Sequence, residues 1–305
     1  MEKTYHSLKD FELSYGKNAI ERANDFQQYI EQLNDFGCKS YWITSHTGIG
    51  STMAIEGFNE PVIAFISNDY LGMSQREETK QAGIDAIKKY GTGACAAQVI
   101  GGYLDIHQQL EKEIASFVGQ EEAILFSSGF GANAGILRAL LGQNDIITGT
   151  FSKSFGCVGG FAAASKKIIQ YLKFYADSNV FSAAPTPQVT ASILKALEII
   201  KKEPQIRTKL WENTNYLRKR LKEEGFDIGK SVSPIFPIMI RDNKKVYEIA
   251  KMLQEKGIFT IGIVYPAVRT KEARLRVSVL ATHKLEQLES LVNTLNDINK
   301  NIKIK

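Results

Sequence analysis

The feature that most constrains the fold is a strand that runs directly into a glycine-rich turn and a helix. Residues 122–127, with an apolar run at 123–126, suit a buried strand, and Ser128, Gly129, Phe130 and Gly131 then open a helix to about residue 141. Such a helix start presents free backbone N–H groups and a favourable dipole, which suits a phosphate. The spacing is GxGxxxG and no ribose-binding acid follows at the expected distance, so a dinucleotide site is not favoured.

A single lysine, Lys153, lies in a run of small and hydroxylic residues, ITGTFSKSFGCVGG at 147–160. Its nearest charged neighbours in the sequence are Asp145 and Lys166. An amine that is kept from counter-ions and partly desolvated has a lowered pKa and can attack an aldehyde. A plain loop lysine between a strand and a turn is the alternative, and the chemistry alone leaves both open.

Composition excludes several classes of protein. The net charge of +5 is mild, and the basic tail at 300–305 is a solvated end rather than a nucleic-acid patch. Cys38, Cys95 and Cys157 lie far apart without a metal or disulfide spacing, which indicates a reducing compartment. The first residues have no apolar core for a signal peptide, and no apolar run approaches a bilayer span. We therefore expect a soluble, cytoplasmic protein without a metal.

The chain falls into three stretches. Residues 1–60 form an arm that begins with a polar helix, whose apolar face carries Phe26, Tyr29 and Leu33. Residues 61–190 form a large α/β domain, and a long helix at about 186–203 leads into a smaller α+β domain at 191–305. Helices are expected there at 209–224, 245–256 and 284–299, with strands at 235–241, 259–264 and 274–280.

Two places offer groups that could hold a carboxylate. The apolar run at 61–67 ends in Asn68, at a strand-to-turn position where binding residues are common, although a plain Asn-Asp turn would look the same. Arg274 and Arg276 alternate with apolar residues and so share one face of their strand. Two arginines on one face need anions, from either a bound carboxylate or internal salt bridges.

Histidines complete no catalytic set. His107 lies in the first turn of a helix that Asp105 is expected to cap, and we interpret this histidine as structural. His283 is expected to stabilise the end of the last strand.

Four segments together resemble the α-oxoamine synthases, which are pyridoxal-phosphate enzymes that condense an amino acid with an acyl-CoA. These segments are SNDYLG, LFSSGFGANAG, TGTFSKSFGCVGGF and ARLRVSVLATH. The resemblance implies a fold-type-I transferase that acts as a homodimer, with the cofactor bound to Lys153. It further implies that Gly129, Phe130 and Thr150 cradle the cofactor, that Ser182 reaches the phosphate in the neighbouring subunit, and that Asn68 and Arg276 hold the substrate carboxylate.

The sequence departs from the family at two points. Many relatives carry an arginine where Ala97 and Gln98 stand. The larger difference is a block on the order of a hundred residues that the family has between the helix after Gly129 and the lysine segment. That block supplies an aspartate paired with the ring nitrogen and two histidines at the cofactor. We favour a segment missing from the sequence over a true truncation.

Three functions remain under consideration. The first is an acyl-CoA:amino acid acyltransferase, with a slight lean towards serine palmitoyltransferase because of SKSFGCVGGF. In that mechanism Lys153 removes the α-proton before the acyl-CoA is attacked. The second is a synthase-like scaffold that lacks the ring-binding block, and the third is a nucleotide-binding α/β protein.

Overall fold

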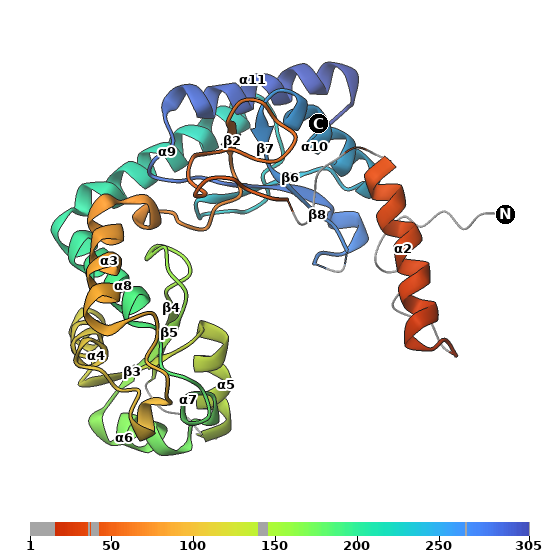
Figure 1. The fold of residues 1–305 in the computed structure, drawn as a ribbon. Coiled ribbons are helices and arrows are strands. Elements are labelled where there is room, and N and C mark those ends of the chain that lie inside the picture. Colours follow the sequence, from red (N-terminus) through yellow and green to blue (C-terminus); the bar gives the residue numbers. More distant parts are fainter. Residues whose placement is uncertain (1–15, 36, 38–42, 140–145, 266, 305) are drawn as a thin grey trace. The chain divides into compact units, whose positions relative to one another are not determined.

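The computed structural model describes residues 16–35, 37, 43–139, 146–265 and 267–304. The chain divides into two compact units, one made of Met1–Tyr70 with Arg207–Lys305 and the other of Leu71–Ile206. Figure 1 shows the elements of both units along the chain. The domain boundaries expected at residues 60 and 190 stay a prediction, and each unit is described by itself.

The unit of Leu71–Ile206 is built on a sheet in which β5 (Gly160–Ala164) lies between β3 (Glu122–Phe126) and β4 (Ile147–Thr150). Because β5 is antiparallel to both neighbours, β3 and β4 run parallel to each other. The helix between them in the chain, α5 (Gly129–Ala139), therefore belongs to a crossover connection between parallel strands, with β5 inserted between the two strands.

Helices cover both faces of this sheet, so that β3 and β5 are almost fully buried, whereas β4 is partly exposed. On one face, Leu125 and Ala163 pack against α4 (Asp105–Val118) and α8 (Pro187–Lys202). On the other face, Ile124 and Ala162 pack against α5 and α6 (Lys166–Tyr175). The helix α3 (Glu77–Tyr90) packs closely on α8, and the short elements are η1 (Met73–Gln75), η2 (Gln98–Ile100) and α7 (Asp177–Val180).

The two edges of this sheet differ. At the edge formed by β3, the Leu125 N–H donates to Glu111 Oε1 at 3.2 Å. The Leu125 carbonyl accepts from the amides of Gln98 at 3.0 Å and of Asn179 at 2.7 Å. Side chains thus occupy the place of a further strand at β3, whereas β4 pairs with β5 and with no other strand of the described residues.

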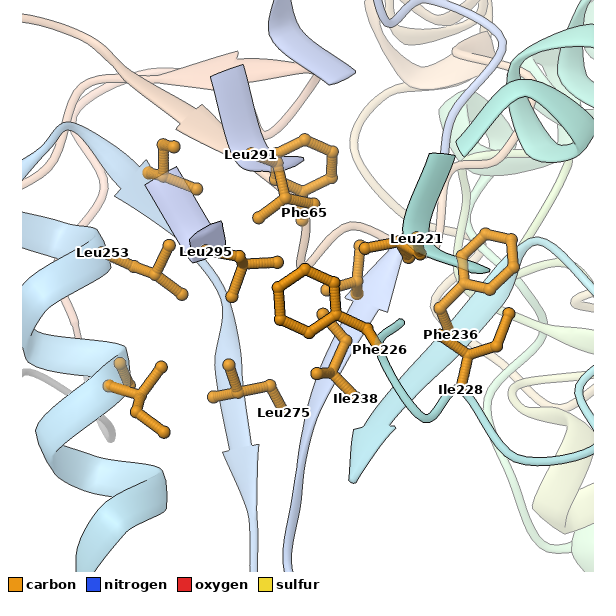
Figure 2. Packing of buried hydrophobic residues seen from close by; sticks show 14 of the residues in the cluster. Phe65, Leu221, Phe226, Ile228, Phe236, Ile238, Leu253, Leu275, Leu291 and Leu295 are labelled. Carbon is orange, nitrogen blue, oxygen red and sulfur yellow. The ribbon is translucent and has the colours of Figure 1, made fainter. Parts of the chain in front are cut away.

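The other unit is built on an antiparallel sheet, in which β9 (Arg274–Ser278) lies between β6 (Ile235–Met239) and β8 (Ile261–Ile263). Alternate residues of these strands, such as Phe236, Ile238 and Leu275, are buried in the large core shown in Figure 2. That core also takes side chains from three helices, α9 (Pro204–Glu223), α10 (Asn243–Glu255) and α11 (Leu285–Asn301). The predicted α+β arrangement is confirmed.

Two further parts belong to this unit. A small sheet pairs β2 (Val62–Ala64) with β1 (Thr52–Met53) and, in parallel, with β7 (Ile258–Phe259). The predicted N-terminal helix is α2 (Ala19–Asp35), in which Phe26 is exposed, while residues 1–15 lie outside the described residues. No helix in the described part of the chain is long and apolar enough to cross a membrane.

Candidate active site

Gly129, Thr150 and Gly160 meet where the three strands of the first sheet reach α5. A Cβ on Gly160 would lie 2.6 Å from Gly129 Cα, and a Cβ on Gly129 would lie 2.7 Å from Thr150 Cβ. Only glycines permit so close an approach of helix and strands. The structure therefore brings together the predicted Gly129 and Thr150, and we call Gly129, Phe130, Thr150, Ser152 and Gly160 the glycine cradle.

The start of α5 leaves N–H groups available in this cradle. Ser128 caps the helix, because its Oγ accepts from Gly131 N at 2.9 Å. Among the described residues, the N–H groups of Gly129 and Phe130 have no partner, and the Phe130 side chain is 85% exposed. Free donors at a helix N-terminus favour an anion such as a phosphate.

Lys153 lies in a tight loop that follows β4. Phe151 N donates to Gly159 O at 2.9 Å and Gly156 N to Lys153 O at 2.9 Å, while the buried ring of Phe151 packs against Phe161 and anchors the loop. Residue 156 has a φ of 65°, which lies in the left-handed region, and this backbone conformation favours glycine there.

The surroundings of Lys153 agree only partly with the sequence-based expectation. No described residue forms an ion pair with Lys153. The side chain is exposed, however, so the expected partial desolvation is not present in the described chain. The hydroxyl groups of Thr150 and Ser152 are hydrogen-bonded to each other at 2.6 Å on the same loop.

The other unit brings together Asn68 and Arg276, the two residues predicted to hold a carboxylate. Arg276 Nη2 donates to Asn68 Oδ1 at 2.8 Å. In the sheet, Arg276 lies between the cross-strand neighbours Pro237 and Ile261, on the face opposite the helices. No described carboxylate pairs with Arg276, whereas Arg274 donates to the carbonyl of Glu272 and lies 3.5 Å from its carboxylate. The internal-salt-bridge interpretation therefore fits Arg274, whereas the charge of Arg276 is unpaired among the residues that the structure describes.

Backbone hydrogen bonds fix this pair in place. Ser278 N donates to Phe65 O and Ala281 N to Tyr70 O, so the turn that carries Asn68 is joined to the end of β9. His283 closes the same joint, because its Nδ1 accepts from Leu280 N at 2.9 Å and its Nε2 lies 3.1 Å from Ala64 O. Burial lowers the pKa of His283 to about 4, so the ring is neutral, as expected for a structural histidine.

His107 is structural too, but its contacts correct the expected cap of α4. Its Nδ1 accepts from Leu104 N at 3.0 Å, its Nε2 lies 2.7 Å from Pro185 O, and burial lowers its pKa. Asp105 does not cap the helix as predicted. Asp105 is already the first residue of the helix, after Leu104 at the N-cap, and its carboxylate binds Lys89 and Tyr90 of α3.

Ser182 lies apart from these groups in the hydrogen-bond network. It follows α7 in a turn where its N–H donates to Asn179 O at 3.3 Å, and no hydrogen bond joins it to the glycine cradle within the described chain. Gln98, which stands where many relatives have an arginine, is used to hold β3.

Sequence reasoning missed two residues of the site. Tyr70 donates to Asn68 Oδ1 at 3.4 Å, and Ser152 adds its hydroxyl to the cradle. Both lie within two positions of a predicted residue and inside segments that resemble the family, which could have pointed to them.

A sequence model of the family described as aminotransferase class I and II matches residues 60–146 and 142–295. The chain therefore belongs to this family of fold-type-I, pyridoxal-phosphate-dependent enzymes.

Its relatives define the group within the family. The chain is 30% identical to serine palmitoyltransferase of Sphingobacterium spiritivorum, over 96% of this chain and 99% of that protein. It is 28% identical to 8-amino-7-oxononanoate synthase of Petrotoga mobilis, over 90% of this chain and 98% of that one. The structure of Sphingomonas wittichii serine palmitoyltransferase shares the fold with a TM-score of 0.87 at 19% identity, covering 93% of this chain and 99% of that chain. The chain is thus an α-oxoamine synthase, and the scaffold interpretation is not favoured.

The comparisons also locate the missing block. The two matched stretches of the family model meet at residues 142–146, directly before β4. The alignment with the Sphingobacterium protein runs over 400 residues although this chain has 305, so it must contain a long gap. The predicted absence of an internal family block is confirmed.

The residues present fit part of pyridoxal phosphate. Within the described chain, the glycine cradle offers the unpartnered N–H groups of Gly129 and Phe130 for a phosphate, beside the hydrogen-bonded hydroxyls of Thr150 and Ser152. Lys153, which has no ion-pair partner among the described residues, offers an amine for the aldehyde. None of the cradle residues carries a carboxylate that could pair with the ring nitrogen.

Proposed function

We propose that this protein transfers the acyl group of an acyl-CoA to the α-carbon of an amino acid, which releases the coenzyme A thiol. Loss of the carboxyl group as carbon dioxide and uptake of a proton then leave an aminoketone. The observation that carries the proposal is the unpaired Arg276 held by Asn68, because this donor set matches a carboxylate. Its resemblance to serine palmitoyltransferase makes a long-chain acyl-CoA and serine the first substrates to test.

Each residue of the proposed site has its own role in this reaction. Bound pyridoxal phosphate supplies an electron sink for the α-carbon. The remaining N–H groups of Arg276 and the Asn68 amide hold the substrate carboxylate and orient the α-carbon. Lys153 Nζ would hold the cofactor aldehyde, and the same amine would take the α-proton of the bound amino acid. The cradle donors, with Ser182 of the neighbouring subunit, hold the phosphate.

The Lys153→Ala variant tests this assignment. We expect borohydride treatment of the purified protein with pyridoxal phosphate to fix the cofactor to the unmodified chain and not to this variant. Lys167→Ala is a matched control, since Lys167 is exposed on α6 and outside the cradle. Labelling of Lys153→Ala at the level of the unmodified chain would contradict the assignment.

We further propose that the protein is a cytoplasmic homodimer. Large apolar side chains are exposed on the unit of Leu71–Ile206, among them Ile100, Phe130, Phe174 and Phe181. Exposed apolar groups of this size are common at protein–protein interfaces. Sedimentation equilibrium should give twice the mass of the chain, and a monomer at micromolar concentration would contradict this proposal.

A further inference from the structure

The hydrogen bonds of Asn68 define which way its side-chain amide faces. Arg276 Nη2 lies 2.8 Å from one atom of that amide, and arginine has donors only, so the atom is the oxygen. Tyr70 OH approaches the same oxygen at 3.4 Å. The Oδ1 atom thus accepts from both neighbours, and Nδ2 faces away from them as a donor.

Both backbone polar groups of Tyr70 are hydrogen-bonded. Its N–H donates to Asn68 O at 2.9 Å, and its carbonyl accepts from Ala281 N at 2.9 Å. Its ring is half-buried. The hydroxyl group therefore has a defined position relative to the Asn68 amide.

The remaining donor groups beside this amide belong to Asn68 and Arg276. Within the described part of the chain, Asn68 Nδ2 has no hydrogen-bond partner, and the side chain of Arg276 forms a hydrogen bond only with Asn68. A carboxylate satisfies such a set, whereas an amide turned by half a rotation would place Oδ1 against the carboxylate and repel it.

We propose that Tyr70 is a positioning residue, which keeps Asn68 turned so that Nδ2 and Arg276 together face the substrate carboxylate. This inference rests on the proposed function and adds a residue to it. Tyr70 acts through Asn68 and takes no part in proton transfer at Lys153. Its loss should therefore weaken the binding of the carboxylate and leave the chemical step unchanged.

The test compares two ligands that differ only in the carboxylate: serine and ethanolamine. Both are titrated into the pyridoxal-phosphate-loaded protein, and the dissociation constants are read from the cofactor absorbance. We expect Tyr70→Phe to raise the dissociation constant of serine about two- to tenfold, as for one lost hydrogen bond, and to leave that of ethanolamine unchanged. In steady-state assays KM for serine should rise and kcat should stay within about twofold of the unmodified value.

Control variants separate positioning from damage to the fold. Tyr90→Phe removes a hydroxyl that binds Asp105 in the other unit, and it should leave the dissociation constants of both ligands unchanged. Asn68→Asp places a carboxylate beside Arg276. It should weaken the binding of serine more than Tyr70→Phe does and leave the binding of ethanolamine unchanged.

Equal weakening of both ligands by Tyr70→Phe, or no change for serine, would overturn the role of Tyr70. If the unmodified protein bound serine no better than ethanolamine, the carboxylate site of the proposed function would fall as well. The two failures are therefore distinguishable.

Discussion

His107 and His283 are both buried, and each ring bridges backbone groups while it is neutral. A proton on either ring would leave a charge in an apolar environment and remove the acceptor at Nδ1. Their lowered pKa values consequently tie folding to pH, because the unfolded chain binds protons that the folded chain does not.

We expect the free energy of unfolding to decrease as the pH falls below about 6.5, the ordinary histidine pKa. The loss from His283 alone should approach about 3 kcal/mol near its folded pKa of about 4, and His107 acts in the same direction. Urea denaturation between pH 7.5 and 4.5 measures this. His283→Gln should show a shallower dependence, while His46→Ala, which removes an exposed histidine, should keep the original slope; equal slopes in all three proteins would contradict the prediction.

Single residues of the site were predictable only where a motif carried them. Lys153, Asn68 and Arg276 were singled out from their sequence surroundings, and the family resemblance gave each a role that stays a prediction. The hydrogen bond between Arg276 and Asn68 was not predicted. The exposure of Lys153 and the contact of Tyr70 could not be predicted, because both depend on which side chains the fold brings together.

Among the elements, the junction of α5 with β5 has the least room. We expect Gly160→Ala to destabilise the chain by about 1–3 kcal/mol and to weaken pyridoxal-phosphate binding, because its Cβ would lie 2.6 Å from the Gly129 backbone and would push the start of the helix from the cradle. Thermal unfolding and cofactor titration measure the two effects. Gly50→Ala is the control, since the nearest atom to its Cβ would be 3.8 Å away; a Gly160→Ala protein as stable as this control would contradict the packing argument.

Helices and strands followed the apolar patterns closely. The helices expected at 209–224, 245–256 and 284–299 are α9, α10 and α11, with ends within a few residues. The strand expected at 259–264 divides into β7 and β8, which join different sheets. The place of β5 between β3 and β4 was not predictable, since strand order depends on long-range pairing rather than on local periodicity.

For the whole molecule, the intact mass decides between a truncation and a missing segment. We favour the missing segment and expect mass spectrometry of the protein from its natural source to exceed 34.0 kDa by about a hundred residues' worth. A mass of 34.0 kDa would mean that the chain is complete as a 305-residue protein, and we would then expect weak cofactor binding and slow turnover, because no ring-nitrogen acid would be supplied.

The unequal edges of the first sheet have a consequence for how this gene could change. The β3 edge is sealed by Glu111, Gln98 and Asn179, so nothing can be added there without breaking three contacts. The strand β4, which forms the other edge, begins directly after the residues where the two matched stretches of the family model meet. A recombination event at that point could add or remove whole strands at the open edge of the sheet. The lysine loop, the glycine cradle and the order of the strands already in place would be inherited intact.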